Sequence, residues 1–138
     1  MASRHSFRDT LPALQLLPLW YAFGAFLLFA VALLSLMPVP PSVGVGDKTS
    51  HLLTYALLCA WFGLLQRSLK GLLIVVLALS AYGMMIELLQ GLTGYRYAEW
   101  ADVLANSIGC LLGTVAYASP LRGAVTRLDN RLASSIRR

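Results

Sequence analysis

Polar residues with helical spacing mark the part of this chain that could carry chemistry. In the segment Asp47-Lys48-Thr-Ser-His51-Leu-Leu-Thr-Tyr55, the residues Asp47, His51 and Tyr55 recur every four positions. On a helix this spacing places the three side chains in one stripe. A histidine beside carboxylates can act as a general acid or base, and a lysine can bind an anion. The segment therefore has the residue types of an acid–base site or of an anion-binding site.

Two further polar pairs have helical spacing. Glu87 and Gln90 are three residues apart, and Asp102 and Asn106 are four apart, so the members of each pair lie on one helix face. Glu87 lies inside an apolar run. At the centre of a membrane an ionisable group costs about 2.5–3.5 kcal/mol on insertion scales, and less near the interface. Glu87 therefore needs a partner, and Arg96 is one of the few basic residues that could reach it.

We expect these side chains to form one polar cluster. In this hypothesis Arg96 or Lys48 balances Glu87 and Asp102, while His51 and Asn106 contribute hydrogen bonds. The candidate ligand-binding residues are Asp47, Lys48, His51, Tyr55, Glu87, Gln90, Arg96, Asp102 and Asn106. The candidate catalytic residues are His51, Glu87 and Asp102.

Two simpler interpretations apply to parts of this set. Asp47, Lys48 and Glu99 lie near helix ends, where charged residues are ordinary and can simply hold helices together. The set also contains a single histidine, whereas zinc sites usually take more histidine or cysteine ligands. We therefore expect no metal and no cofactor.

The elements that position these residues are expected to be membrane helices. The 138 residues are 58% hydrophobic and only 12% charged, with a mean hydropathy of +0.70, whereas soluble domains carry about 25% charged residues. In water so short a chain would expose much of its apolar excess, but in lipid the composition is suitable. The two cysteines, Cys59 and Cys110, lie inside apolar runs and are interpreted as small buried hydrophobic residues.

Four apolar runs have the length of membrane spans. They are Leu16–Met37, Thr49–Gln66, Gly71–Leu92 and Trp100–Ser119. The first would be about 33 Å long as a helix, enough to cross a hydrocarbon core of about 30 Å, and Pro38, Pro40 and Pro41 end it. The fourth is expected to be the least apolar, because it contains Asp102 and Asn106. Its Gly109 and Gly113 form a GxxxG pattern, which lets helices pack closely in lipid.

The tail after Pro120 has a different character. An apolar stripe at helical spacing consists of Leu121, Val125, Leu128, Leu132 and Ile136, and arginines lie off it. This pattern predicts a basic amphipathic helix on the membrane surface, and a disordered basic tail is the alternative. The predicted organisation is a cytoplasmic segment 1–15, a four-helix membrane domain 16–119 and a cytoplasmic tail 120–138.

The basic residues indicate the orientation. In a four-helix topology nine of them lie on one side: Arg4, Arg8, Arg67, Lys70, Arg122, Arg127, Arg131, Arg137 and Arg138. Only Lys48 and Arg96 lie on the other side. The positive-inside rule then places both termini in the cytoplasm and the polar cluster on the outer side of the inner membrane. The net charge of +5 sits at helix ends and tails rather than on a basic face, which argues against nucleic acid as a partner.

At these residues the sequence resembles the VanZ-like membrane proteins. Asp47-Lys48-x-x-His51-x-x-x-Tyr55 is similar to the motif that opens their second helix, and Glu87-x-x-Gln90 to the end of their third. The stretch from Arg96 to Gly109 is similar to their R-x-x-x-x-D-x-x-x-N-x-x-G block. The blocks follow in the family's order and cover residues 47–113. The resemblance implies a four-helix protein of the cell envelope, and it suggests a link to sensitivity to the glycopeptide antibiotic teicoplanin.

Three functions compete at this stage. The first is a non-enzymatic protein whose outer polar pocket binds a membrane lipid, a lipid-linked cell-wall precursor or a lipoglycopeptide. The second is a membrane-embedded enzyme acting on such a lipid, with His51 as acid or base beside Glu87 or Asp102. The third, proton-coupled transport, needs a polar path that the cytoplasmic halves of the helices lack in a monomer, although an oligomer could line one.

Overall fold

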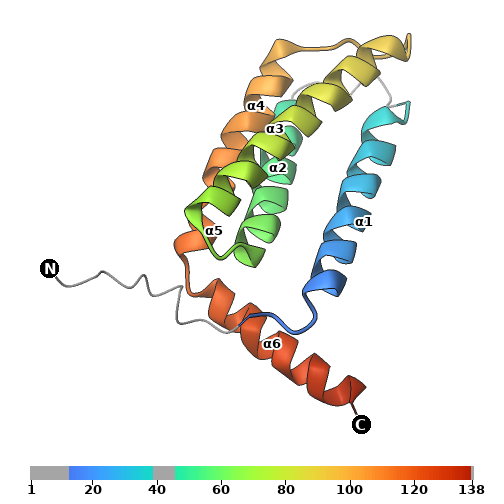
Figure 1. Ribbon diagram of the computed structural model, residues 1–138. Coiled ribbons are helices and arrows are strands. Elements are labelled where there is room, and N and C mark those ends of the chain that lie inside the picture. The colour runs from blue at the N-terminus through green and yellow to red at the C-terminus, as the bar shows by residue number, and fades with distance from the viewer. Residues whose placement is uncertain (1–12, 39–45, 138) are drawn as a thin grey trace, which may run out of the picture.

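The computed structural model describes residues 13–38 and 46–137, except for the side chain of Asp47. This part of the chain forms helices and no strand, which confirms the all-α prediction. The helices are α1 (Leu17–Leu36), α2 (Asp47–Leu65), α3 (Leu69–Leu92), α4 (Trp100–Gly113), α5 (Val115–Ala118) and α6 (Leu121–Ile136) (Figure 1). Most of the predicted segment 1–15 and of the proline-rich loop lies outside the described residues.

Helix α2 is the central element of the bundle. It contacts each of the other helices, and its contact with α4 is by far the most extensive. Two glycines of α4 make this contact close, because a Cβ atom at Gly109 would meet the backbone carbonyl of Leu52 and one at Gly113 would meet that of Ala56. The GxxxG pattern thus lies on the α4 face that packs against α2.

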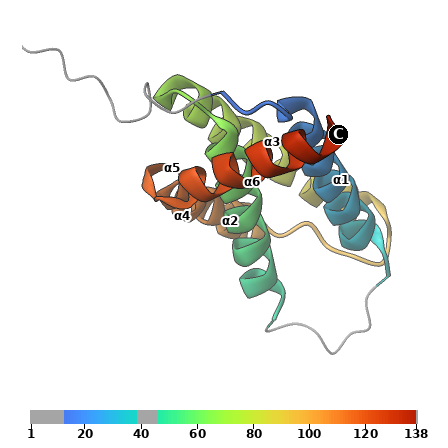
Figure 2. The ribbon, with the colours of Figure 1, turned by 90° about the horizontal axis from the view of Figure 1, so that it is seen from below.

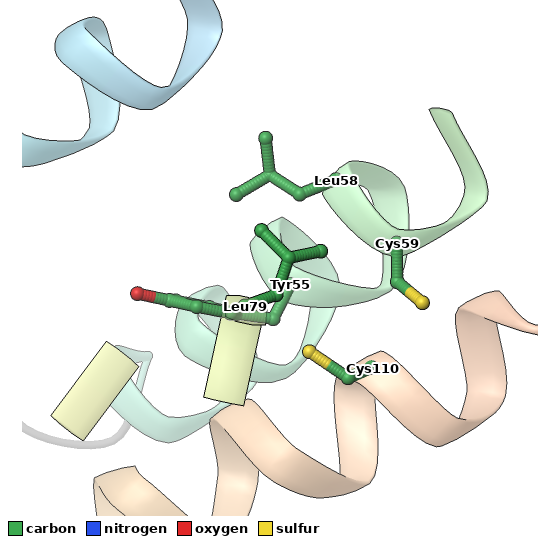
Figure 3. Packing of buried hydrophobic residues seen from close by; sticks show 5 residues of the cluster. All are labelled: Tyr55, Leu58, Cys59, Leu79 and Cys110. Atoms are coloured by element: carbon green, nitrogen blue, oxygen red, sulfur yellow. The ribbon is translucent and has the colours of Figure 1, made fainter. Parts of the chain in front are cut away.

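A small apolar core joins α2 to α3 and α4. Its fully or nearly fully buried members are Tyr55, Leu58, Cys59, Leu79 and Cys110. Figure 3 shows the thiols of Cys59 and Cys110 turned toward one another from α2 and α4. Both thiols are free and buried, in agreement with their interpretation as small buried residues.

The outer surface of the bundle is strongly apolar. On α1, for example, Phe26 and Phe29 are 62% and 66% exposed. Within the described residues, three stretches are long and apolar enough to cross a membrane: Leu17–Leu36, Leu69–Leu92 and Trp100–Ala118, which joins α4 to α5. Such helices are those of a multi-pass membrane protein.

Contrary to expectation, the fourth run qualifies as a membrane span and helix α2 does not. Helix α2 has 19 residues, but it begins at Asp47, and the polar side chains of its first two turns lower its hydropathy below that of a typical span. The helix lies alongside α3 and α4 (Figure 1), which cover one side of it, whereas Leu53 and Leu57 are exposed. The predicted run ends agree with the helix ends to within two residues. The fourth run, however, is interrupted at Thr114, between α4 and α5.

The tail forms the helix α6, which crosses beneath the bundle (Figure 2). Its predicted apolar stripe faces outward, since Leu128 and Ile136 are 48% and 67% exposed. The opposite face is buried and partly charged, and it includes Arg122 and Asp129. The placement of the outward stripe on a membrane surface stays a prediction.

Two buried charges of α6 bind the ends of other helices. Asp129, which is fully buried, accepts hydrogen bonds from the backbone N–H groups of Gln15 (2.6 Å) and Leu16 (3.0 Å) and from the indole of Trp20 (2.8 Å). These groups lie at the start of α1, where a helix favours a negative charge. Burial raises the pKa of Asp129, but the hydrogen bonds from Trp20, Gln15 and Leu16 outweigh it and leave the pKa below its usual value.

Arg122 makes the corresponding contact at the end of α2. Its guanidinium donates hydrogen bonds to the backbone carbonyls of Leu64, at 3.1 Å, and of Gln66. The C-terminal end of a helix favours a positive charge, and its last carbonyls have no partner inside the helix. The sequence placed the arginines of the tail only off the apolar stripe of a basic amphipathic helix, and it gave no sign of this contact of Arg122 inside the molecule.

Candidate functional site

Three ionisable side chains from three helices meet at the other end of the bundle. His51 lies in the second turn of α2, Glu87 near the end of α3 and Asp102 in the first turn of α4. Helix α3 runs antiparallel to α2 and α4 (Figure 1), so these positions fall at the same level. One nitrogen or oxygen of each side chain lies within 4.8 Å of the others. The side chains are 9%, 2% and 4% exposed, respectively.

Asn106 completes the inner part of this cluster. Its Oδ1 lies 3.0 Å from Nδ1 of His51, and the same nitrogen lies 3.6 Å from Oε1 of Glu87. The other oxygen of Glu87 accepts a hydrogen bond from the backbone N–H of Glu99 at 3.4 Å. Gly83 provides the space, because a Cβ atom there would lie 2.9 Å from Nδ2 of Asn106. The cluster therefore depends on close packing of α3 against α4.

Lys48 connects the cluster to its exposed rim. Its Nζ lies 2.7 Å from Oε2 of Glu99 and 3.7 Å from Oδ1 of Asp102. The hydrogen bond from Lys48 lowers the pKa of the Glu99 carboxyl, which lies just before α4. Lys48 and Glu99 are both about half exposed, so their pairing is weak in energy. The hypothesis that Lys48 balances Asp102 therefore agrees with the structure, although Lys48 also binds Glu99.

Arg96 and Gln90 bind the end of α1 instead of the acids. Arg96 donates a hydrogen bond of 3.1 Å to the backbone carbonyl of Ser35, and Gln90 donates one of 2.8 Å to the same carbonyl. The hydroxyl of Tyr95 donates to the carbonyl of Leu36. Among the described side chains Arg96 forms no ion pair, and its positive charge lies at the negative end of the α1 helix dipole. These acceptors are backbone carbonyls, which every residue has, so the sequence gave no signal for them.

A cavity of about 190 Å³ lies between α1 and α2, beside the cluster. Its lining residues are Val31, Leu34, Ser35, Ser50, His51, Thr54, Tyr55 and Arg96. The contribution of α1 is mainly apolar, whereas α2 contributes hydroxyl groups and the imidazole. The cavity therefore presents an apolar wall and a polar wall to any occupant.

Several buried polar atoms in this region have no hydrogen-bond partner among the described residues. They include the hydroxyl of Tyr55, Nδ2 of Asn106 and Oδ1 of Asp102, which Lys48 approaches only to 3.7 Å. A buried polar atom without a hydrogen bond costs about 1–3 kcal/mol. A ligand or an ion that contacts these atoms would explain why the folded protein accepts this cost.

The predicted site residues thus fall into groups. His51, Glu87, Asp102 and Asn106 form the cluster, and Tyr55 lies beside it on the cavity wall. Lys48 is at the rim, while Gln90 and Arg96 turn to α1. Asp47 begins α2, but its side chain lies outside the described part of the chain.

Comparison with known proteins gives one match. A family model described as VanZ/LLP1 matches residues 3–122. The matched range contains α1 to α5 with all the cluster residues, and it ends in the first turn of α6. No curated protein and no solved structure matches the chain.

Proposed function

Given that the chain belongs to the VanZ/LLP1 family, we propose that it is a cell-envelope protein that binds the anionic head group of a lipid in the cavity between α1 and α2. The observation that carries this proposal is the two-sided lining of the cavity. Val31 and Leu34 form an apolar wall, and Arg96 provides a positive charge within the same cavity. A lipid has both properties at the junction of its head group and its acyl chains.

Arg96 is suited to recognise the anionic group. Its bond to the carbonyl of Ser35 uses one of the several N–H donors of the guanidinium, so other donors are available for phosphate or carboxylate. Such bonds to an ionised acceptor are among the strongest in proteins. Arg96 is partly buried, which reduces the competition from water.

The size of the cavity limits what enters it. Pockets that enclose a whole drug-sized ligand measure about 300–1,000 Å³, so a cavity of about 190 Å³ accommodates only a head group. The acyl chains would lie along the outside of the bundle. Leu34 lines the cavity and is still 65% exposed, so the apolar wall continues onto the lipid-facing surface.

The proposed protein crosses a bacterial-type inner membrane four times, and both of its termini lie on the cytoplasmic side. Helix α2 lies beside three apolar helices and would cross with them. The nine-to-two distribution of basic residues then places the cavity toward the outer leaflet. A reporter fused after Arg138 that is active only in the cytoplasm tests this. Activity of a periplasmic reporter at that position would contradict it.

Lipid mass spectrometry on the purified full-length protein tests the binding site. We expect an anionic lipid class to copurify with the wild type and to be reduced at least about tenfold in Arg96→Gln, because one charge-assisted contact is lost. Arg67→Gln is the matched control, since Arg67 is exposed at the opposite end of α2. Equal enrichment in all three proteins, or none in the wild type, would reject the proposal.

A lipoglycopeptide such as teicoplanin has the same chemistry, an acyl chain beside a polar head group, and we propose it as a second ligand of this cavity. Expression of the wild-type chain in a susceptible host should change the teicoplanin concentration that stops growth, and Arg96→Gln should not. The same growth curve for wild type, Arg96→Gln and empty vector would exclude this ligand.

The alternative proposal, an enzyme acting on a lipid-linked phosphate, is favoured by the position of His51. The imidazole lines the cavity, and its Nδ1 is held by Oδ1 of Asn106 at 3.0 Å with the Glu87 carboxylate nearby at 3.6 Å, so the ring is oriented as a base would need. If the protein is an enzyme, His51→Gln should bind the lipid but convert it at least about 100-fold more slowly, in the range that general acid–base catalysis contributes. Absence of any conversion of copurified lipid by the wild type leaves the binding proposal in place and excludes the enzyme.

A further inference from the structure

We propose that His51, Glu87 and Asp102, together with the side-chain carbonyl of Asn106, bind one divalent transition-metal ion. The site lies behind the cavity wall, among α2, α3 and α4. It does not depend on the proposed binding of a lipid, because neither Glu87, Asp102 nor Asn106 lines that cavity.

The distances between the candidate ligand atoms are those of atoms that share an ion. Nδ1 of His51 lies 3.0 Å from Oδ1 of Asn106 and 3.6 Å from Oε1 of Glu87. Two ligands bound at about 2.1 Å to the same ion lie roughly 3.0 Å apart in an octahedral and roughly 3.4 Å apart in a tetrahedral arrangement. His51, Glu87 and Asp102 already have ligand atoms within 4.8 Å of one another, so small side-chain movements would complete the site.

The charge of the cluster also favours a divalent cation. Glu87 and Asp102 bring together two carboxylates that are at least 96% buried. Lys48 pairs with Asp102 and with Glu99, but it is about half exposed, so water weakens its compensation of the buried charge. Buried charges need compensation, and an ion of charge +2 supplies it.

Unsatisfied polar atoms provide an independent observation. Oδ1 of Asp102 belongs to a side chain that is 4% exposed, and it has no hydrogen bond among the described residues, since Nζ of Lys48 approaches it only to 3.7 Å. The backbone N–H of Glu99 holds the outer oxygen of Glu87, as groups around a metal site commonly orient its carboxylate ligands. A carboxylate oxygen with no hydrogen bond, beside an oriented carboxylate and an imidazole, is the arrangement that a metal ion would satisfy.

The donor set indicates the class of metal. One imidazole nitrogen with carboxylate and amide oxygens suits zinc, manganese or iron(II) better than copper(I), which prefers sulfur, or calcium, which takes oxygen ligands alone. A single histidine argued against a metal when only the sequence was considered. The proposal rests instead on the tertiary structure, which brings two acids from other helices to that histidine.

Metal titration of the full-length protein, purified through a tag without histidine and then stripped with a chelator, tests this proposal. Zinc content after dialysis should reach about one equivalent, and Co²⁺ should give a visible absorption spectrum typical of nitrogen and oxygen ligands. Loss of a contact outside the metal ligands weakens metal binding about 10–100-fold. Glu87 and Asp102 are proposed as direct ligands, so Glu87→Gln and Asp102→Asn should each weaken Zn²⁺ binding by more than that.

Glu99→Gln is the matched control. It removes the same charge from the same end of the bundle, but Glu99 is 53% exposed in its side chain and is not one of the three clustered ligands. It should bind Zn²⁺ within a few-fold of the wild type. Size-exclusion chromatography checks that each variant is folded, and His51→Gln replaces any variant that aggregates. No bound zinc in the wild type, or equal binding in wild type, Glu87→Gln and Asp102→Asn, would overturn the proposal.

Discussion

Buried charges occur at both ends of α2, and they are satisfied in different ways. At the C-terminal end Arg122 and Asp129 of α6 bind backbone groups at the ends of α2 and α1. At the N-terminal end Glu87 and Asp102 gather around His51, and nearby polar atoms of Asp102 and Asn106 have no hydrogen bond among the described residues. Both regions contain charged side chains that are at least 96% buried.

The difference separates a structural role from a functional one. A buried charged side chain that binds a helix terminus supplies hydrogen bonds to backbone groups that have no partner within the helix. Such a contact stabilises the fold. Acids that face one another and an imidazole have no such reason to be buried together. Their arrangement costs stability, which proteins commonly accept at functional sites. If this difference holds, stability should depend on the contacts of Arg122 and Asp129, and binding on the cluster around His51.

The largest loss of stability is expected for Asp129→Ala. It removes the carboxylate that accepts hydrogen bonds from the N–H groups of Gln15, Leu16 and Trp20. We expect a loss of about 3 kcal/mol in the free energy of unfolding, since one hydrogen bond to a charged group contributes about 1.5–3 kcal/mol. Unfolding in detergent measures it, with the exposed neighbour Asn130→Ala as control. A loss no larger than that of the control would contradict a structural role for Asp129.

Arg122→Met should have the next largest effect on stability. The methionine keeps much of the buried volume but donates no hydrogen bond to the carbonyls of Leu64 and Gln66. The expected loss is about 2 kcal/mol, from hydrogen bonds to a charged group at a helix end. Arg127→Met is the matched control, because Arg127 lies on the same helix but is exposed. Equal thermal midpoints for the two variants would show that the contact with α2 contributes nothing.

At the other end, Glu87→Gln and Asp102→Asn should change stability little. With a chelator present, each neutral side chain removes a buried charge from a crowded cluster, so we expect a change within about 1 kcal/mol or a gain. The same variants should lose Zn²⁺ binding. A loss of about 3 kcal/mol or more in either variant would mean that the cluster, like α6, serves the fold.

The smallest effect expected is a dependence on acid pH. Since hydrogen bonds hold the pKa of Asp129 below its usual value, its contribution to stability is fully present above about pH 4, the ordinary pKa of an unfolded aspartate. It is lost as the pH falls through the lower, folded value. The difference in unfolding free energy between wild type and Asp129→Asn should therefore be constant from pH 7 to 5 and shrink at pH 3. A difference that grows on acidification would give the opposite sign and refute this assignment.

The sequence predicted the helices well, and several polar residues that it singled out lie together in the structure, for a local reason. Uninterrupted apolar runs with glycine, proline or charged residues at their ends indicate where membrane helices begin and end. The polar residues that interrupt these runs, such as His51, Glu87 and Asp102, are conspicuous because they are costly there. Helical spacing then placed them on defined faces, and the structure brings the three together.

Partners were predicted less well, because a partner can be a backbone group. Arg96 or Lys48 was expected to balance the acids; Lys48 pairs with Asp102, but Arg96 donates a hydrogen bond to the carbonyl of Ser35 at the end of α1. Arg122 and Asp129 were missed in the same way. Every residue has a backbone carbonyl and, except for proline, an N–H, so the sequence carries no signal for which helix end will lie beside a charged side chain.

The sequence by itself determined that this chain forms apolar helices with a few buried polar residues, because the transfer of side chains into lipid is a property of each residue type. Only the tertiary structure decided which of those residues share a site and which bind helix ends. That decision depends on distances between separate helices, and the close approach of α4 to α2 at Gly109 and Gly113 sets them.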